Sequence, residues 1–500
     1  MELYRELYTG LQIRQMERHY CDENGLCYEL MHRAGLALAE CIEKYVDDRS
    51  TGILVLCGPG NNGGDGYEMA SILLERGFTG VRCVQYRAPK TGTEADLACR
   101  AYIERGGVIQ TELDDELPKN TDVIVDALLG IGVSGEVRQP MPDWIGFINR
   151  HGRERFVISV DVPSGLNGDT GVCCTDAVHA DVTVMLLRPK AGLYTGVACD
   201  YTGRLEFNDL GVKDGDECGC GHQIRLCSYD DPEVLCSLPK RRNSSNKNDS
   251  GRLVLVGGAP TMPGALKMSA MAALRSGAGL VRVAASPESI PLIFAGSPEL
   301  MLWPLNEEGL SGMERLLSWS HAMVLGPGLG RDEWASRVFE SCIDSSVPKI
   351  VDADGLYWLS KTVKVLRNAV ITPHEMEAAR LLQTDVEYVR QNRYNTAVRL
   401  HELTGAVVVL KGFGTLIYDG DTTAVSTEGN ASMAVGGMGD VLAGIIGALM
   451  AGGMNCSDAA RVGVAVHGRA GVLASDDGFI GTLPTDLLAE IRKLMNLKHD

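Results

Sequence analysis

Residues 53–76 read ILVLCGPGNNGGDGYEMASILLER, which joins an apolar strand pattern, a glycine-rich turn and a helical pattern. Ile53–Cys57 is an unbroken apolar run of strand length, and Met69, Ile72 and Leu73 then recur at the spacing of one helix face. A strand that leads directly into a helix is the first part of a βαβ unit, in which parallel strands are buried under helices. This stretch therefore predicts an α/β fold with a parallel sheet.

The alternation of strand and helix patterns continues on both sides of this stretch. Apolar runs of strand length occur at residues 81–86, 123–125, 156–160 and 181–187. Residues 238–250 are rich in Lys, Arg, Asn and Ser and predict a linker, after which the alternation restarts. Strands are predicted there at residues 253–257, 280–285, 321–325, 349–352, 369–372 and 406–410, with a helix over residues 264–276. We therefore expect two α/β domains, residues 1–224 and residues 225–500.

Composition and charge narrow the class of protein. Of 500 residues, 45% are apolar and 22% are charged, which excludes a mainly disordered chain or a coiled coil. The formal net charge of −18 argues against nucleic acid or an anionic membrane as the main partner. Residues 1–20 lack an apolar signal core, and the longest weakly polar stretch, residues 441–454, is too short to cross a bilayer. We expect a cytoplasmic protein that binds small molecules or proteins, with no nucleic-acid and no membrane partner.

The 15 cysteines are scattered along the chain without a secretory signal, so we expect reduced thiols rather than a disulfide framework. Cys218, Cys220 and His222 form the one cluster that resembles a metal site. Because it lacks a second pair of ligands at zinc spacing, we interpret it as a solvated loop.

The glycine-rich turn is the first candidate for a binding site. Five glycines lie among residues 57–66, where they permit positive φ and close approach of the backbone. The start of the following helix offers free N–H groups that suit a phosphate, whereas an ordinary strand-to-helix turn needs only one or two glycines. Polar residues also follow other strands of this domain, and ligands of parallel sheets bind where the strands end. The residues expected to meet at that edge are Asn62, Asp65, Asp126, Asp161 and Ser164.

The second domain has its own glycine-rich helix start. Residues 434–442 read AVGGMGDVL and lead into a long apolar run. Gly436, Gly437 and Gly439 favour an anion-binding helix N-terminus, and Asp440 would lie beside the bound phosphate. The alternative is that Asp440 is an ordinary helix cap. Four further motifs follow predicted strands and are expected along the same edge, namely residues 257–265 (GGAPTMPGA), 326–330 (GPGLG), 372–377 (TPHEME) and 411–415 (KGFGT). His374 follows Thr-Pro in one of these motifs, which favours a ligand contact over an ordinary surface histidine.

Four motifs of the first domain, at residues 30–35 (LMHRAG), 61–66, 126–135 and 161–168, resemble the NAD(P)H-hydrate epimerase family. The resemblance covers roughly residues 1–220 and implies a Rossmann-like three-layer αβα fold. It further implies K⁺ ligands at Asn62, Asp126 and Ser164, and contact of Asp161 with the reacting nicotinamide ring. The hydrated dinucleotide would be bound by Asn61, Asn62, Gly63, Gly64, Asp65, Gly130, Ile131, Gly132, Val133, Ser134, Gly135, Glu136 and Asp161. Ile131 stands where the family usually has Thr, and His32 where it usually has Glu.

Chemistry agrees with the role of Asp161. Interconversion of the two C6 hydrates requires the hydroxyl group to leave, which forms an iminium-like ring, and to return on the other face. One carboxyl group must therefore act as an acid and then as a base, and its negative charge would also stabilise the cationic ring. We expect Asp161 to be this catalytic residue, with Asp65 as the second candidate.

The five motifs of the second domain resemble the NAD(P)HX dehydratase family, which has the ribokinase-like αβα fold, over roughly residues 225–495. The resemblance implies that the hydrated dinucleotide contacts Ala265, Gly328, His374 and Asp440. The adenine nucleotide, with its Mg²⁺, would be bound by Lys411, Gly412, Phe413, Gly414, Thr415 and Gly439. Asp440 would remove the proton of the C6 hydroxyl so that the oxygen attacks the terminal phosphoryl group. Met438 occupies a position usually taken by a small residue.

Together these readings predict a bifunctional isomerase and lyase that repairs hydrated NADH and NADPH. The fused arrangement resembles bacterial members, which generally use ADP, so we expect ADP as the nucleotide and also a homo-oligomer. Two alternatives remain: a kinase of a small hydroxylated vitamin precursor fused to a nucleotide-binding domain, and a non-catalytic nucleotide-binding module.

Overall fold

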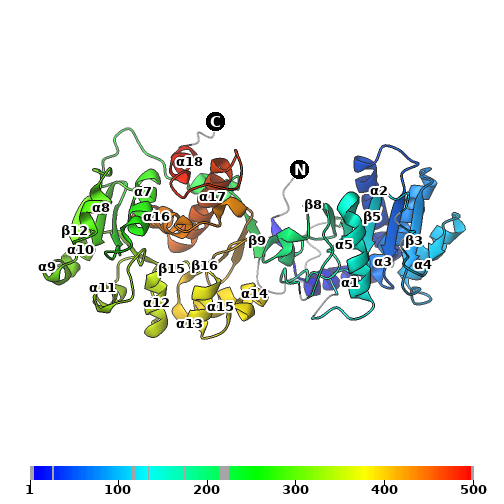
Figure 1. Cartoon of the computed structure of the whole chain (residues 1–500), viewed down its shortest axis with the longest axis horizontal. Coiled ribbons are helices and arrows are strands. Elements are labelled where there is room, and N and C mark those ends of the chain that lie inside the picture. Colours follow the sequence, from blue (N-terminus) through cyan, green and yellow to red (C-terminus); the bar gives the residue numbers. More distant parts are fainter. Residues whose placement is uncertain are drawn as a thin grey trace. The chain divides into compact units, whose positions relative to one another are not determined.

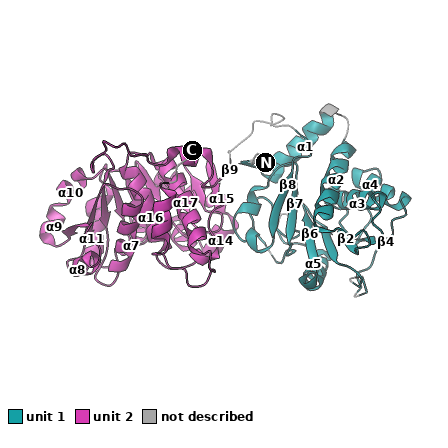
Figure 2. Ribbon diagram, turned by 90° about the horizontal axis from the view of Figure 1, so that it is seen from above, with its two compact units in different colours: residues 1–221 teal, residues 222–500 magenta. Residues whose placement is uncertain are grey.

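The computed structural model describes residues 5–24, 27–114, 116–117, 119–132, 135–173, 175–212 and 224–496. The chain divides into two compact units, Met1–Gly221 and His222–Asp500 (Figures 1 and 2). Each unit has its own sheet and its own core, as the two α/β domains of the sequence predict. We describe each unit by itself.

Unit 1 is built on a parallel sheet in the order β4-β3-β2-β5-β6-β7-β8. The strands are β2 (Ile53–Cys57), β3 (Val81–Gln85), β4 (Ile109–Gln110), β5 (Val123–Ala127), β6 (Phe156–Val160), β7 (Val182–Leu186) and β8 (Arg204–Asn208), and the short β1 is Glu6–Leu7. The helices are α1 (Gly10–Asn24), α2 (Cys27–Tyr45), α3 (Asn61–Glu75), α4 (Glu94–Glu104) and α5 (Met141–His151), with 3₁₀ turns at Gly152–Glu154, Ala191–Tyr194 and Ala198–Asp200.

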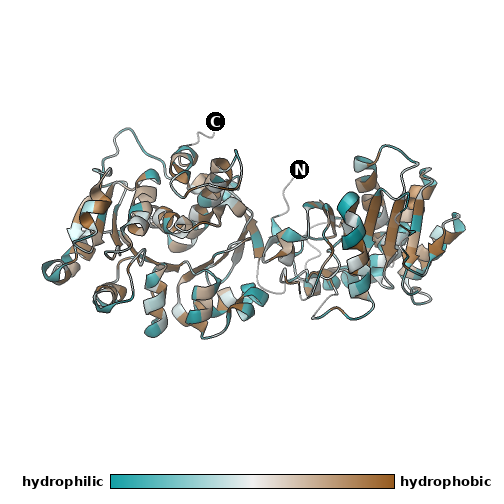
Figure 3. Cartoon of the chain, viewed as in Figure 1, coloured by the Kyte–Doolittle hydropathy of each residue, from teal (hydrophilic) through white to brown (hydrophobic). Residues whose placement is uncertain are grey.

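Alternate residues of β2 face two different layers of helices. Ile53, Val55 and Cys57 pack in a cluster with side chains of α2, α3 and α4. Leu54 and Leu56 pack in a second cluster with side chains of α5. Because successive side chains of a strand point to opposite faces, this division places the sheet between two helical layers. Unit 1 is therefore a three-layer αβα domain, and its buried strands are largely brown in Figure 3.

Unit 2 contains a mixed sheet in the order β9-β18-β17-β16-β15-β14-β13-β10-β11-β12. Its strands are β9 (Ile224–Cys227), β10 (Arg252–Val256), β11 (Leu280–Ala285), β12 (Met301–Pro304), β13 (Ala322–Leu325), β14 (Lys349–Val351), β15 (Ala369–Ile371), β16 (Val407–Leu410), β17 (Leu416–Tyr418) and β18 (Thr423–Ser426). β17 is antiparallel to both of its neighbours, whereas the other pairs are parallel.

The helices of unit 2 are α6 (Pro232–Ser237), α7 (Pro263–Arg275), α8 (Ile290–Phe294), α9 (Glu307–Ser311), α10 (Met313–Trp319), α11 (Glu333–Ile343), α12 (Asp354–Lys361), α13 (Glu375–Leu382), α14 (Val386–Gln391), α15 (Arg393–Thr404), α16 (Met438–Ala451), α17 (Cys456–Ala474) and α18 (Leu487–Leu494), with a 3₁₀ turn at Ala431–Met433. The buried α16 packs closely against α7: a Cβ atom added at Gly444 would lie 2.1 Å from the Ser269 carbonyl oxygen. Small residues in α16 thus allow the helix to enter the core.

The predicted strands agree with the observed ones to within one or two residues, but two other predictions need correction. Helix α3 begins at Asn61, so most of the glycine-rich segment is helical rather than a loop. None of its five glycines has a positive φ. Four of them, all except Gly60, allow close packing instead; a Cβ atom at Gly63, for example, would lie 1.9 Å from the Gly58 carbonyl oxygen.

The polar segment at residues 238–250 connects α6 to β10, two elements of unit 2. Residues that precede the segment already belong to this unit, because β9 pairs with β18 in its sheet. The sequence pattern marks a surface connection, which is the composition expected for a solvent-exposed turn as well as for a linker.

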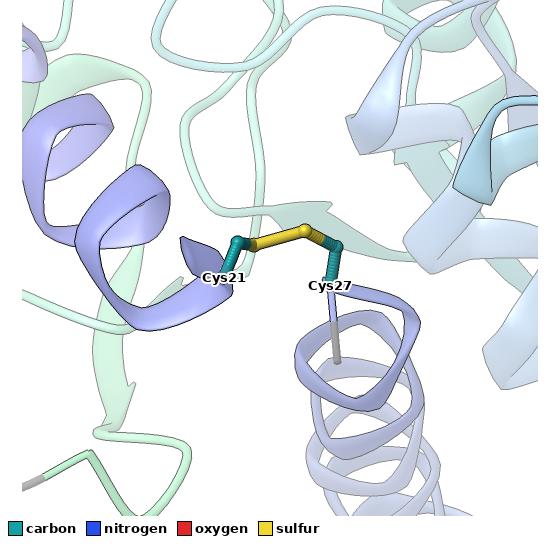
Figure 4. Close-up of a disulfide and its surroundings, with 2 residues drawn as sticks. All are labelled: Cys21 and Cys27. Atoms are coloured by element: carbon teal, nitrogen blue, oxygen red, sulfur yellow. A yellow bond between two sulfur atoms is a disulfide. The ribbon is translucent and has the colours of Figure 1, made fainter. Parts of the chain in front are cut away.

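One pair of cysteines departs from the prediction of reduced thiols. Cys21, near the end of α1, forms a disulfide with Cys27 at the start of α2 (Figure 4). Ten other cysteines in the described part of the chain are free thiols. The cluster of Cys218, Cys220 and His222 lies outside the described residues. Within the described residues, no helix is both long enough and apolar enough to span a membrane.

Candidate functional site

A cavity of about 360 Å³ lies in unit 1 where the strands of the parallel sheet end. Asn61 and Asp65 from α3 line it together with Asp161, which follows β6. The other charged residues of the lining are Glu17, Arg18, Asp22, Glu94 and Lys190. Apolar side chains of α2 and the Cys21–Cys27 disulfide complete the lining. The cavity therefore joins an apolar wall to a group of carboxyl side chains, which is the usual character of a small-molecule site.

Asp161 is held by donors on one of its two carboxylate oxygens. The residue has a φ of 66°, which is rare for a side chain other than glycine and places it at the turn after β6. Oδ1 accepts a hydrogen bond of 3.0 Å from the Leu186 backbone N–H. It also forms a buried ion pair with Lys190 Nζ. Lys190 Nζ also donates to the Leu186 carbonyl oxygen at 2.6 Å. Neighbouring strand ends thus fix the orientation of Asp161.

Two other carboxyl groups of the cavity are biased toward their protonated forms. Burial raises the pKa of Asp65 well above its ordinary value, and the nearby charges of Asp161 and Glu17 add to this effect. Burial and the charge of Asp161 likewise raise the pKa of Glu17, against the opposing effects of Lys190 and Arg14. The cavity thus combines a carboxylate paired with an ammonium group and carboxyl groups that retain protons, an arrangement suited to acid–base chemistry.

Asp126 lies at the centre of a buried group of oxygen atoms. Its Oδ1 accepts from Ser164 Oγ at 2.6 Å, and its Oδ2 accepts from Ser159 Oγ at 2.9 Å and from the Ser164 backbone N–H at 2.8 Å. Burial raises the pKa of Asp126, while these hydrogen bonds oppose the rise. The Asn62 side chain lies against Gly130, where an added Cβ atom would be 3.1 Å from Asn62 Oδ1. Asn62 Nδ2 is buried without a hydrogen-bond partner.

In unit 2, charged residues that follow three strands, β14, β15 and β16, meet beside the start of α16. Lys411 Nζ lies 2.8 Å from Asp352 Oδ1 and 3.7 Å from Glu377 Oε2. Burial alone would lower the pKa of Lys411, but the carboxylates of Asp352 and Glu377 raise it. A Cβ atom at Gly439 would be 3.3 Å from Lys411 Nζ, which places the first turn of α16 against this cluster.

Asp440 lies in that first turn and is strongly affected by the cluster. Burial, followed by the nearby charge of Asp352, raises the pKa of Asp440 to about 7. Burial likewise raises the pKa of Glu377 to about 7, although Lys411 opposes the rise. A carboxyl group that titrates near neutrality is suited to act as a general base.

His374 lies close to this cluster but has a structural role as well. Its Nδ1 accepts hydrogen bonds from the backbone N–H groups of Met376 and Glu377 at 3.1 and 3.4 Å, and Glu377 Oε2 accepts from the His374 N–H at 2.9 Å. This reciprocal pair forms a capping box at the start of α13. Burial and the charge of Lys411 lower the pKa of His374, so the ring favours its neutral form. Its Nε2 lies 3.3 Å from Glu377 Oε1, and the side chain is 49% exposed, so part of the ring remains accessible to a ligand.

Two other predicted contacts of unit 2 are neighbours. Gly328 has a φ of 58°, and a Cβ atom there would lie 3.3 Å from Ala265 Cβ. On the opposite side of the cluster, Gly412 has a φ of 138° in the turn after β16, and Thr415 Oγ1 donates to its carbonyl oxygen at 2.9 Å. Phe413, in the same turn, is 47% exposed.

Comparisons with known proteins match both units. Residues 27–192 match the family model described as YjeF-related protein N-terminus, and residues 253–493 match that of NAD(P)H-hydrate dehydratase. The bifunctional NAD(P)H-hydrate repair enzyme Nnr of Escherichia coli (strain K12) is 40% identical over 488 residues, which cover 97% of this chain and 93% of that protein. The chain belongs to the family of bifunctional NAD(P)H-hydrate repair enzymes. The family member of the same name from Vibrio cholerae is 39% identical over 501 residues, which cover 99% of each chain.

A solved structure supports the fold of unit 2. A ribokinase-like superfamily protein from Enterococcus faecalis V583 has a TM-score of 0.50 and 28% sequence identity, and the match covers 54% of this chain and 95% of that chain. The Rossmann-like and ribokinase-like folds that the sequence motifs imply are therefore confirmed, and so is the expected pairing of the two family domains.

The structure brings together some, but not all, of the residues expected to bind the dinucleotide in this repair-enzyme family. Asn61, Asp65 and Asp161 line one cavity, whereas the buried Gly63 and Gly64 pack inside the domain. In the loop after β5, Gly130 and Ile131 are partly buried and Gly132, Gly135 and Glu136 are exposed. Val133 and Ser134 lie outside the described residues.

His32, which replaces the usual glutamate of the family, has a partner of its own. Its Nδ1 lies 2.7 Å from Glu68 Oε1 on α3, and Tyr28 donates to Glu68 Oε2 at 2.6 Å. The substitution therefore joins α2 to α3. It does not place a charge among the residues that line the cavity.

Sequence reasoning did not identify four charged residues of these sites: Glu17, Lys190, Asp352 and Glu377. Lys190 and Asp352 carried a usable signal, because each follows an apolar strand that ends at the functional edge of its sheet. Glu377 lies three residues after His374, which is the spacing of a capping box. Glu17 belongs to α1, whose sequence pattern does not reveal that the helix covers a cavity.

Proposed function

We propose that unit 1 interconverts the R and S epimers of hydrated NADH and NADPH, and that unit 2 converts the S epimer back to the intact cofactor at the expense of ADP. The proposal rests on one observation: in a chain of this repair-enzyme family, each unit holds an aspartate in a position suited to the expected reaction. Asp161 lines the cavity of unit 1, and Asp440 lies in the first turn of α16 beside Lys411.

In unit 1, the proposed reaction begins with protonation of the C6 hydroxyl group. Asp161 is the first candidate to supply this proton and Asp65, whose pKa is raised, is the second; the C6–O bond breaks as the ring nitrogen forms a double bond to C6. Water then adds to C6 from the other face and transfers its proton to the Asp161 carboxylate. The negative charges of the cavity stabilise the cationic ring between the two steps.

In unit 2, the proposed reaction begins with removal of the C6 hydroxyl proton by Asp440. The oxygen attacks the terminal phosphoryl group of ADP, so AMP leaves and the hydroxyl becomes a phosphate ester. Phosphate is a far better leaving group than hydroxide, so the C6–O bond breaks, and loss of a C5 proton to solvent or to the departing phosphate forms the C5–C6 double bond of the dihydronicotinamide ring. The N–H groups at the start of α16 and the Lys411 ammonium would hold the phosphoryl charge.

Two ions fit the residues of the proposed sites. Asn62, Asp126 and Ser164 offer oxygen atoms and one formal negative charge, a donor set that suits K⁺, and the orphaned Asn62 amide group is free to reorient toward a ligand. Bound K⁺ would supply fixed positive charge beside the dinucleotide phosphates. In unit 2, Mg²⁺ would arrive with ADP and neutralise part of its charge, while Asp352 and Glu377 offer carboxylates nearby.

The proposal is tested by recovery of reduced-nicotinamide absorbance from a purified mixture of R and S NADHX, with Mg²⁺, K⁺ and either ADP or ATP. We expect complete recovery with ADP. Asp440→Asn should abolish recovery, whereas Asp161→Ala should confine it to the S epimer and to R epimer that converts spontaneously. Failure to recover absorbance with either nucleotide, together with a phosphorylated product from a small hydroxylated compound, would contradict the dehydratase assignment and favour a kinase.

A further inference from the structure

We infer that Lys190 is a positioning residue of the epimerase site, which anchors Oδ1 of Asp161 so that Oδ2 alone exchanges protons with the substrate. This inference rests on the proposed function of unit 1 and extends it to a residue outside the family motifs described above. It assigns different roles to the two Asp161 oxygens: Oδ1 is held by the protein, and Oδ2 exchanges protons with the substrate.

The first argument is the unequal hydrogen bonding of the two oxygens. Oδ1 receives both the Lys190 ammonium group and the Leu186 backbone N–H. Oδ2 has no hydrogen-bond or ion-pair partner among the residues that the structure describes. Asp161 also lines the cavity, so the oxygen without a partner is the one available to water or to the C6 hydroxyl of the dinucleotide.

The second argument is that Lys190 is itself rigidly held. Its side chain is 1% exposed, and its ammonium group also donates to the Leu186 carbonyl oxygen at 2.6 Å. The backbone of Leu186 thus contacts both members of the pair, through its N–H to Asp161 and through its carbonyl to Lys190. A buried lysine with two fixed acceptors loses little further freedom when substrate binds, which is the requirement for a positioning group.

The third argument concerns charge. Five carboxyl groups, those of Glu17, Asp22, Asp65, Glu94 and Asp161, line the same cavity, and those of Glu17 and Asp65 have a raised pKa. The charged groups that act on them from the surrounding elements are Arg14 of α1, Glu68 of α3 and Lys190. The Lys190 ammonium lowers the pKa of both Glu17 and Asp65, so its loss would shift these two carboxyl groups further toward their protonated forms and would leave the Asp161 carboxylate without its buried counter-charge.

Bonds and protons balance in each step of the proposed epimerisation. Water forms a C6–O bond on one face of the iminium-like ring, and its proton moves to Asp161 Oδ2 as the ring nitrogen recovers its electron pair. In the reverse direction Oδ2 returns the proton to the departing hydroxyl group. Lys190 gains and loses no proton in either direction.

The test measures R-to-S interconversion by chromatography with the full chain and no nucleotide, so that unit 2 does not consume the product. We expect Lys190→Met to lower kcat by roughly 100-fold, because proton transfer by Asp161 depends on its orientation, while KM changes little. Lys190→Arg should recover much of the lost kcat because it restores a cation. Ethylamine should raise the rate of Lys190→Ala with saturation, because the small cation can enter the emptied position in the cavity.

The matched control is Lys44→Met, which removes a half-exposed lysine paired with Glu206 at 2.5 Å, outside the cavity. It should interconvert the epimers at the wild-type rate and show no response to ethylamine. The Lys190→Met, Asp161→Asn double variant removes both charges of the buried pair, so its thermal unfolding separates loss of folding from loss of proton transfer.

The inference is overturned if Lys190→Met keeps the wild-type kcat. It is also overturned if Lys190→Arg and Lys190→Ala with ethylamine are as inactive as Lys190→Met, because a purely structural lysine gives that pattern. If the wild-type chain does not interconvert the epimers at all, the proposed function of unit 1 fails instead, and the two failures are thereby distinguished.

Discussion

At position 440, burial opposes the charge that the proposed reaction needs. Asp440 lies in the first turn of α16, where burial and the Asp352 carboxylate raise its pKa to about 7. Burial also raises the pKa of Glu377, in the same cluster, to about 7. Lys411 is the cation that keeps both values from rising further. Substrate deprotonation in unit 2 should therefore depend on pH near neutrality.

The sign of this dependence follows from the role of Asp440 as a base. Only the ionised carboxylate accepts the hydroxyl proton, and a raised pKa means that this form is lost as the pH falls through about 7. We expect kcat/KM of the dehydratase reaction, measured with S-NADHX and ADP, to rise between pH 6 and pH 8 with a midpoint near 7. Asp440→Asn should lower the rate by roughly 100-fold or more and abolish this limb of the profile. A flat profile over this range would show that another group removes the proton.

At the scale of elements, the glycines of α3 are explained by packing rather than by backbone conformation. Gly63 and Gly58 approach each other so closely that a Cβ atom at Gly63 would lie 1.9 Å from a backbone oxygen. A Cβ atom added at Gly66 would lie 2.7 Å from the Cβ of Ala127 in β5. These contacts place the start of α3, and with it Asn61 and Asp65, at the edge of the sheet that carries the cavity.

This interpretation makes a prediction about stability. Gly63→Ala should destabilise unit 1 by about 2 kcal/mol or more, because the added methyl group overlaps backbone that cannot easily move. The control is Gly146→Ala in α5, where nothing lies within 4 Å and φ is not positive. Since alanine favours helices, the control should be neutral or stabilising by up to about 1 kcal/mol. Hydrogen exchange of peptides from unit 1 during urea unfolding measures both changes, and equal effects of the two variants would refute the packing role.

The central strands of both sheets were predictable because each is an apolar run bounded by turn residues, and their observed bounds differ from the prediction by at most two residues. The strands β4, β8, β9, β12, β17 and β18 were not predicted, because they are short or interrupted by polar residues. The start of α3 was not predictable, because glycine is a poor helix former and only tertiary packing favours a helix at these glycines. Asp161 and Asp440 could be identified from their positions after a strand and before a helix. Lys190 also follows an apolar strand, but its pairing with Asp161 was not predictable, because the contact spans 29 residues and forms only when β6 and β7 lie side by side.

At the scale of the whole molecule, each unit has its own sheet and its own group of charged residues. Glu17, Asp65, Asp161 and Lys190 all belong to unit 1, whereas Asp352, Glu377, Lys411 and Asp440 belong to unit 2. Separate family models match the two units as well. We therefore expect each reaction to use the residues of its own unit, and the S epimer made by one unit to reach the other through solution.

This independence can be tested by mixing two inactivated chains. Alone, Asp161→Asn should repair R-NADHX only as fast as the epimers interconvert spontaneously, and Asp440→Asn should interconvert them without restoring absorbance. A mixture of the two variants with ADP, Mg²⁺ and K⁺ should restore rapid repair, at a rate that increases with the concentration of each. The control mixture replaces the Asp161→Asn chain with an Asp161→Asn, Asp440→Asn chain, and it should restore nothing. If the first mixture repairs R-NADHX only at the spontaneous rate while the wild-type chain is fast, the S epimer must pass between the units of one chain without release.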